Sequence, residues 1–294
     1  MNYIKPTKAD RLILGINSAL LIFAVLVIVV PLIYIVVGSF MEPTALLNKG
    51  FSFDLKDYSL QGYNLILSDP SIIRGFGNSI YYSLAFTISA VSVTVLAGYT
   101  LSHRDLVGGK FFSTLILITM FFGGGLIPTY LVVKNLGLLD TVWALALPSA
   151  VSGYYVFLAR TFFNTLPKEL KEAAKIDGAS EFQILLKVIV PLSKPIIFVL
   201  ALYNFVGHWN DFFQAMIYLQ DQDKYPLQMV LRRILILNKV DPNVVSDIQE
   251  QAELSRLSEL MKYSSIVISS LPLLIIYPYV QKYFEKGAMV GSLK

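Results

Sequence analysis

LILGINSALLIFAVLVIVVPLIYIVVGSFM, residues 12–41, is the longest run of the chain without a charged side chain. Arg11 stands directly before it and Glu42 directly after it. About 20 apolar residues are enough for a helix to cross the roughly 30 Å hydrocarbon core of a bilayer. The run therefore predicts a membrane-spanning helix.

The composition of the whole chain agrees with a membrane protein. Of its 294 residues, 55% are hydrophobic and 15% are charged, whereas soluble domains are about 25% charged. The absence of cysteine excludes disulfides, thiolate catalysis and cysteine-ligated metals, and the presence of only two histidines argues against a metal site. In a membrane protein, the small positive net charge of +4 reflects which side of the bilayer the Lys and Arg residues occupy. It does not indicate an affinity for nucleic acid, so no nucleic-acid partner is expected.

Six charge-poor runs predict an all-α transmembrane fold with six helices, in which residues 1–294 form a single domain. The fifth run is interrupted only by Asp211. The predicted spans are 12–40, 76–102, 111–133, 141–160, 195–219 and 263–282, with two long connections at 164–191 and 220–262.

The distribution of Lys and Arg residues indicates the orientation. If both termini lie inside, 14 of the 24 Lys and Arg residues fall in the inner segments. Both termini are therefore expected to be cytoplasmic, with the 164–191 loop inside and the 220–262 loop outside. Within the outer loop, residues 247–261 are expected to form a mostly polar helix.

The inner loop, TFFNTLPKELKEAAKIDGASEFQILLKVIVPLS at 161–193, has the pattern of two short helices. Pro167 suits the first position of a helix, and Gly178 suits its carboxyl-terminal cap. Ser180 and Gln183 then form a capping box that opens a second helix, which Pro191 is expected to end. The second helix carries an expected apolar stripe of Phe182, Leu185, Leu186 and Ile189.

The residues alone leave two interpretations of this loop open. It could lie flat on the lipid headgroups as an amphipathic segment. It could instead dock to a soluble partner and transmit motion to the spans. The small alanines of the first helix would let another protein approach closely.

The same residues resemble the EAA signature of ABC-importer permeases. The resemblance rests on Glu172-Ala173-Ala174, Gly178 four residues further on, and Val188, Val190 and Pro191, with valines where isoleucine and leucine are usual. It implies that Glu172–Gly178, including Asp177, form a coupling helix that docks in a cleft of a separate ATP-hydrolysing subunit. No G-x4-G-K-[ST] phosphate-binding motif occurs in the chain, so this chain is expected to be no enzyme and to bind no cofactor.

The resemblance extends over most of the chain and is closest to the second permease of the maltose-type carbohydrate importers. Stretches that carry it are GGGLIPTYLVVKNLGLLDT at 123–141, GHWNDFF at 207–213 and the ending KYFEKGAMVGSLK. It implies a type I importer fold in a bacterial cytoplasmic membrane and import of a complex or acidic oligosaccharide. The implied partners are a related second permease, two subunits that bind ATP and Mg²⁺, an external sugar-binding protein, and membrane lipid.

Candidate residues for the sugar path are polar or aromatic side chains in or near the spans. Asp211 is the one acid inside a predicted span, although a position near the outer edge would also let it snorkel to water. Trp can stack on sugar faces, and Asn and Asp can bind hydroxyl groups. His208 is expected to be a packing residue. The candidates are Asn78, Tyr154, Tyr155, Trp209, Asn210 and Asp211.

Two other classes of function remain for comparison. An ion-coupled secondary transporter is the main alternative, although no inverted repeat is visible and Asp211 lies far from the midplane. An intramembrane hydrolase is a weaker one, because Ala150-Val151-Ser152-Gly153 lacks the leading glycine of a nucleophile elbow.

Overall fold

The computed structural model describes residues 7–237 and 248–291, in which helices joined by turns and loops are accompanied by one isolated β-bridge between Met41 and Tyr58. The predicted all-α fold is confirmed, and the chain divides into two compact units. Unit 1 comprises residues up to Asp69 together with 234–270, and unit 2 comprises Pro70–Arg233 together with the residues from Leu271 onward. The last three residues of the KYFEKGAMVGSLK ending lie outside the described residues.

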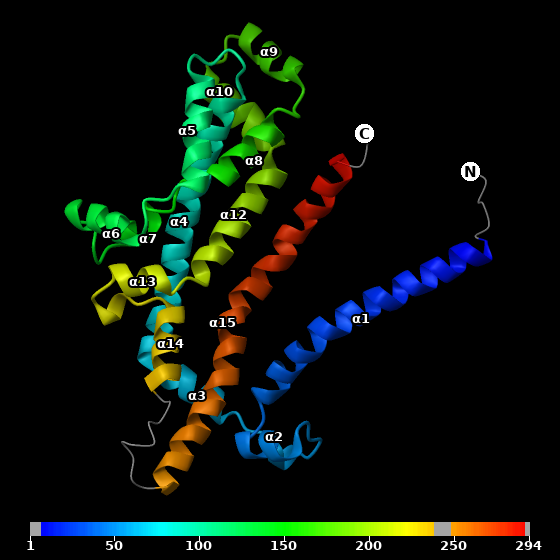
Figure 1. Ribbon diagram of the computed structural model, residues 1–294, viewed down its shortest axis with the longest axis vertical. Coiled ribbons are helices and arrows are strands. Elements are labelled where there is room, and N and C mark those ends of the chain that lie inside the picture. Colours follow the sequence, from blue (N-terminus) through cyan, green and yellow to red (C-terminus); the bar gives the residue numbers. More distant parts are fainter. Residues whose placement is uncertain (1–6, 238–247, 292–294) are drawn as a thin grey trace. The chain divides into compact units, whose positions relative to one another are not determined.

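Unit 1 contains one long helix, several short ones and the first part of the last helix (Figure 1). The first helix opens with a capping box in which Thr7 accepts a hydrogen bond from the Asp10 N–H and Asp10 accepts one from the Thr7 N–H. Pro31 lies inside this helix. The elements are α1 (Lys8–Gly38), α2 (Pro43–Lys49), η1 (Leu55–Asp57), α3 (Gln61–Ser68) and α15 (Ile248–Gly291, of which the residues to Ser270 belong to unit 1).

Close backbone contacts hold α15 against the short helices of unit 1. A Cβ at Gly62 would lie 2.8 Å from the Leu260 carbonyl oxygen, so only glycine fits at this crossing. The Ser264 hydroxyl donates to the Ser39 carbonyl at the end of α1 at 3.3 Å, and Arg256 forms an ion pair with Glu42. The predicted polar helix at 247–261 is thus part of α15, which begins at Ile248, while residues 238–247 of the predicted outer loop lie outside the described residues.

Unit 2 is built around α4 (Pro70–Ser102), which packs along α8 (Gly153–Phe163) and α12 (Lys194–Trp209). Gly98 marks the tightest approach, because a Cβ there would lie 2.9 Å from the Ala159 Cβ and 3.2 Å from the Arg160 nitrogen. The core at this end is formed by Val95, Tyr99, Ala159, Phe163, Ile184, Leu185, Ile189, Ile196 and Leu200.

Three of the six predicted spans are single long helices, and three are broken. Lys8–Gly38, Pro70–Ser102 and Arg256–Pro278 are each long and apolar enough to cross a membrane. The predicted spans at 111–133, 141–160 and 195–219 are not continuous helices. The pieces are α5 (Gly109–Phe121) and α6 (Leu126–Asn135), α7 (Val142–Ala146) and α8, and α12 and α13 (Phe213–Tyr218).

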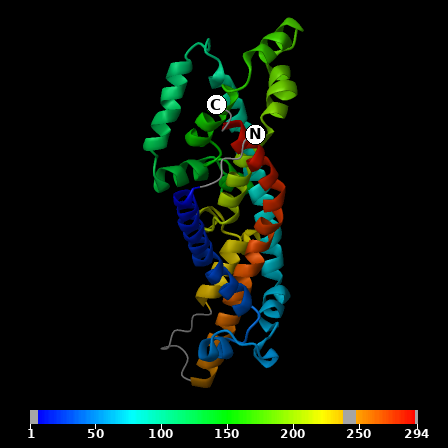
Figure 2. The same cartoon turned by 90° about the vertical axis from the view of Figure 1, so that its right-hand side faces the viewer.

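Each break has a local cause in the sequence. Between α5 and α6 the chain bends by 116° through Gly123–Gly125, and Gly125 has φ +83°, ψ 168°, a region that only glycine occupies readily (Figures 1 and 2). Pro148 lies in the turn between α7 and α8, where no helical N–H bond is required. Between α12 and α13 the Asp211 carboxylate accepts hydrogen bonds from the Phe213 and Gln214 backbone N–H groups and starts α13.

The connection between α8 and α12 contains the two predicted short helices and lies at one end of unit 2 (Figures 1 and 2). The capping box of Ser180 and Gln183 forms as predicted. The helix after it continues through a π-helical turn, and the chain bends by 83° before α12. The elements are α9 (Lys168–Ile176), α10 (Glu181–Ile184), η2 (Leu185–Ile189) and α11 (Val190–Leu192).

At the opposite end of unit 2, Asp140 holds η3 (Gln222–Lys224), which precedes α14 (Leu227–Leu237). Asp140 has φ +61°, a left-handed conformation that Asp tolerates better than most residues. One carboxylate oxygen accepts the backbone N–H groups of Gln220 and Asp221, and the other accepts from Lys224 Nζ at 2.6 Å. The hydrogen bond from Lys224 lowers the pKa of Asp140 below its ordinary value of 3.8.

Candidate functional site

The elbow between α9 and α10 ends in a complete Schellman motif. The Gly178 N–H donates to the Lys175 carbonyl, and the Ala179 N–H donates to the Ala174 carbonyl, both at 3.0 Å. Gly178 has φ +77°, and nothing lies within 4 Å of the position that a Cβ would occupy. A side chain here would meet backbone strain rather than a clash, so glycine is required for the shape of the turn.

The predicted coupling residues divide between the surface and the core. Glu172, Ala173, Asp177 and Gly178 are exposed. Asp177 is the C-cap residue of α9. Ala174 is half-buried and packs against the core of unit 2. The helix is therefore fixed from beneath while its acidic and small residues face outward.

Apolar side chains surround the elbow on its exposed side. Ile176 is 86% exposed, Phe182 is 62% exposed, and Leu186 is also exposed. The expected apolar stripe of the second helix was therefore only half right, because Leu185 and Ile189 enter the core while Phe182 and Leu186 do not. The buried side of this segment is instead formed by Ile184, Leu185 and Ile189, and Phe182 and Leu186 lie outside it.

Pro191 does not end the second helix, contrary to the expectation from the sequence. It is exposed within α11, and the break falls after it at Ser193, which is fully buried. The π-helical turn makes this possible, because the Val190 N–H already bonds to Leu185 five residues back. Pro191 then lacks an N–H where the α-helical ladder is already interrupted.

Glu181, which the sequence did not single out, connects the elbow to α4. Its carboxylate accepts from Lys175 Nζ of α9 at 2.7 Å and from the Tyr99 hydroxyl of α4 at 2.7 Å. His103 Nε2 lies 3.4 Å from it, and Lys171 Nζ lies 5.3 Å from the centre of the Tyr99 ring. The hydrogen bonds from Lys175 and Tyr99 lower the pKa of Glu181. Because Tyr99 lies 82 residues before Glu181, no spacing pattern could have predicted the cluster.

Several of the candidate path residues have structural partners instead of an open surface. Trp209 is 1% exposed and packs edge-on to Phe76, with ring centroids 5.5 Å apart. The expectation that it presents a face for stacking on sugar does not hold in this structure. Asn78 Nδ2 donates to the carbonyls of Asp223 and Tyr225, so it positions the segment around η3.

The remaining aromatic and amide candidates lie apart from one another. Tyr154 is exposed on α8, whereas Tyr155 stacks on Tyr203 of α12 with ring centroids 6.5 Å apart. Asn210 is exposed, and its side-chain amide donates to the Val206 carbonyl one turn back. These residues therefore do not form one lined path in this arrangement.

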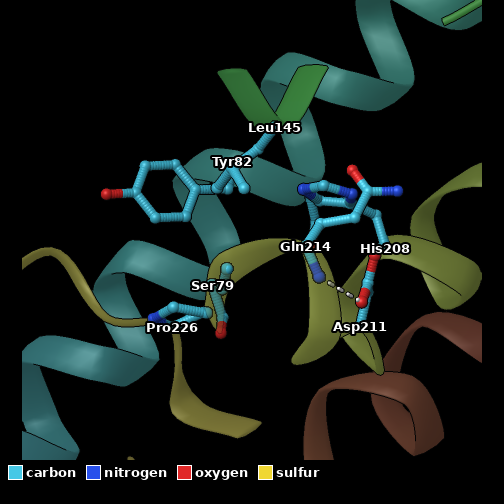
Figure 3. A pocket seen from close by; sticks show the side chains of 9 residues that line it. Ser79, Tyr82, Leu145, His208, Asp211, Gln214 and Pro226 are labelled. Atoms are coloured by element: carbon cyan, nitrogen blue, oxygen red, sulfur yellow. Dashed lines mark hydrogen bonds between the residues drawn. The ribbon is translucent and has the colours of Figure 1, made fainter. Parts of the chain in front are cut away.

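Asp211 and His208 share a small polar cavity with residues that the sequence did not single out (Figure 3). With a volume of about 10 Å³ it has room for about one water molecule and is too small for a sugar ring. The buried Ser83 hydroxyl and Gln214 amide oxygen face it without a described partner. His208 stacks on Phe86, with ring centroids 4.6 Å apart. Asp211 therefore caps α13 beside a polar cavity.

Long apolar helices, broken helices between them and a helical elbow with an exposed EAA segment are the features expected of a membrane transport subunit. The family comparison agrees over nearly the full length. The chain belongs to the family described as the inner membrane component of binding-protein-dependent transport systems, whose pattern matches residues 3–290. The family resemblance stated from the sequence is therefore confirmed.

Similar proteins include two from Bacillus subtilis (strain 168) and one of known structure. Protein LplC is 40% identical over 98% of this chain and 97% of its own length. The polygalacturonan/rhamnogalacturonan transport system permease protein YtcP is 38% identical over 97% and 98%. A chain from the crystal structure of a bacterial ABC transporter involved in import of the acidic polysaccharide alginate matches with a TM-score of 0.81. It is 29% identical and covers 97% of this chain and 100% of its own. The importer fold predicted from the sequence is confirmed.

Proposed function

We propose that this chain is one membrane-spanning half of an ATP-driven importer that carries an oligosaccharide containing acidic sugar units. The observation that carries the proposal is the elbow, in which Glu172, Ala173 and Gly178 are exposed beside Ile176 and Phe182. Relatives that transport polygalacturonan or alginate support the acidic class of substrate.

The proposed assembly contains a related second permease, two ATP-binding subunits and an external sugar-binding protein. ATP and Mg²⁺ bind to the ATP-binding subunits, and both termini of this chain lie in the cytoplasm, on the side of the elbow. Membership of a binding-protein-dependent family supports the sugar-binding partner and counts against the ion-coupled alternative.

The proposed mechanism moves a rigid element and breaks no bond in this chain. Closure of the ATP-binding subunits displaces α9. This helix is held to the rest of unit 2 by the packing of Ala174 against the core and by the bonds of Glu181 to Lys175 and Tyr99. The displacement reaches α4 by way of Tyr99 and reorients the path from one side of the membrane to the other.

The direct experiment is the double variant Glu172→Lys with Gly178→Asp in the complete complex. We expect it to lose copurification of the ATP-binding subunits and ATP-dependent uptake, because it reverses a surface charge and strains the Schellman turn. The matched control is Glu169→Lys, an equal charge reversal at an exposed position in the first turn of the same helix. Normal assembly and uptake in the double variant would refute the coupling assignment.

A further inference from the structure

At the end of unit 2 that carries the elbow, a basic cavity of about 760 Å³ lies beside the connection between α4 and α5. Three formally positive side chains line it, and no carboxylate is among the described lining residues. The polar side chains around it are His103, Arg104, Lys110, Ser113, Thr114 and Arg160.

The three formally positive side chains of this cavity form no described ion pair, whereas the lining residue His103 lies 3.4 Å from the Glu181 carboxylate. Arg160 donates to the Ser113 hydroxyl at 3.2 Å, which is a neutral partner. Arg104 and Lys110 have no described carboxylate partner. Cations gathered without carboxylates favour an anion that can accept several hydrogen bonds, and phosphate is such a group.

An apolar groove of about 440 Å³ adjoins the basic cavity and shares two of its walls, Leu101 and Leu106. The groove is lined by side chains of α4 and α5 that fall within the predicted spans, namely Val93, Leu96, Ala97, Thr100, Phe112 and Ile116. Val93, Leu96 and Phe112 remain exposed in this chain.

The two cavities match two layers of a bilayer. The basic cavity corresponds to the headgroups, and the apolar groove corresponds to the hydrocarbon core. Arg104 and Lys110 belong to the short connection after the predicted span at 76–102 and before that at 111–133, where the chain meets the headgroups. Val93 lies 11 residues before Arg104, or about 16 Å along a helix at 1.5 Å per residue. This distance is close to one leaflet of a hydrocarbon core about 30 Å thick.

We propose that the two cavities together form a binding site for an anionic phospholipid. The phosphate binds among Arg104, Lys110 and Arg160, and an acyl chain lies in the groove between α4 and α5. Charge complementarity selects an anionic headgroup over a zwitterionic one, and the groove selects a lipid over a soluble phosphate. The proposal concerns this cavity alone and does not depend on the transported substrate.

Native mass spectrometry of the intact purified complex tests the proposal with three probes: phosphatidylglycerol, phosphatidylcholine and glycerol phosphate. We expect retention of phosphatidylglycerol alone. Arg104→Gln with Lys110→Gln should weaken it about 25-fold, or about fivefold for each charge removed. Ala97→Trp should weaken it by filling the groove. The control Lys8→Gln with Lys134→Gln removes the same charge from two exposed positions outside the cavity and should bind as the unmodified complex does.

Unchanged phosphatidylglycerol binding in the charge variant would overturn the proposal, and so would equal binding of glycerol phosphate or of phosphatidylcholine. A photo-crosslinking residue at position 97 gives a second measurement that needs no loss of function. Its main adduct in the complex should be a phospholipid. An adduct to another protein chain would show that a helix fills the groove and would refute a lipid site.

Discussion

Glu181 bonds both to α9, through Lys175, and to α4, through Tyr99. We expect Glu181→Gln to weaken both hydrogen bonds and to lower the free energy of unfolding by about 1 kcal/mol, because Lys175 and Glu181 are each about half exposed. Uptake per ATP hydrolysed should fall about fivefold while hydrolysis continues. Paired assays of ATP hydrolysis and uptake in proteoliposomes measure the ratio.

Glu169→Gln is the matched control for this variant, since Glu169 is an exposed glutamate of α9 that loses the same charge. It should leave the ratio of uptake to hydrolysis unchanged. A Glu181→Gln complex that hydrolyses ATP and transports at the ordinary ratio would show that the cluster does not transmit motion.

Asp140 makes stability depend on pH in a direction set by its pKa. The hydrogen bond from Lys224 lowers that pKa below 3.8, so the contribution is complete above pH 3.8 and is lost as pH falls through the folded value. Asp140→Asn should lower the free energy of unfolding at pH 7 by about 1 kcal/mol. Asn tolerates the left-handed conformation at this position, so the variant isolates the charge.

Thermal melting of the purified chain from pH 7 to pH 3 checks this prediction. The difference between the unmodified chain and Asp140→Asn should shrink below pH 3.8. Asp105→Asn, an exposed aspartate without a described ion pair, should melt as the unmodified chain does. A difference that stayed constant with pH would contradict the role of the carboxylate.

At the scale of elements, Gly98 sets how closely α4 approaches α8. Gly98→Ala should lower the free energy of unfolding by about 1–3 kcal/mol, because its Cβ would overlap Ala159 and the Arg160 backbone. Gly77 lies in the same helix with nothing within 4 Å of its Cβ position, so Gly77→Ala should be neutral or stabilising by up to about 1 kcal/mol. Equal melting temperatures for the two variants would contradict the close packing.

Local signals predicted the elements well where one residue or motif decides the structure. The capping box of Ser180 and Gln183, the turn at Gly178 and the long helix around residues 12–40 could all be derived from the sequence. The broken helices could not, because hydrophobicity alone does not distinguish a straight span from two helices joined by Gly123–Gly125. Pro191 was misplaced because the π-helical turn before it leaves no simple pattern.

The candidate site was predictable in part. Features set by residues close together in the sequence could be predicted, whereas contacts between distant segments could not. The proposed coupling residues lie within one continuous stretch, so their spacing alone predicts the turn at Gly178 and the capping box that follows it. The path candidates depend on which helices meet, and burial of Trp209 against Phe76 or the contacts of Asn78 with the segment around η3 could not be foreseen. Residue types that can bind sugar, such as Trp, Asn and Asp, can also pack in the core, hydrogen-bond to neighbouring segments or cap a helix.

At the scale of the whole molecule, the family and the fold place this chain among importer permeases. The central proposal is that ATP hydrolysis drives the transport. The most direct measurement is uptake of an acidic oligosaccharide into proteoliposomes that contain the full complex, with the sugar-binding protein outside. We predict that uptake occurs only when ATP and Mg²⁺ are supplied on the side of the membrane that carries the elbow. Ionophores should leave the rate of uptake unchanged. Uptake that continued without ATP and stopped when ion gradients were collapsed would contradict the account.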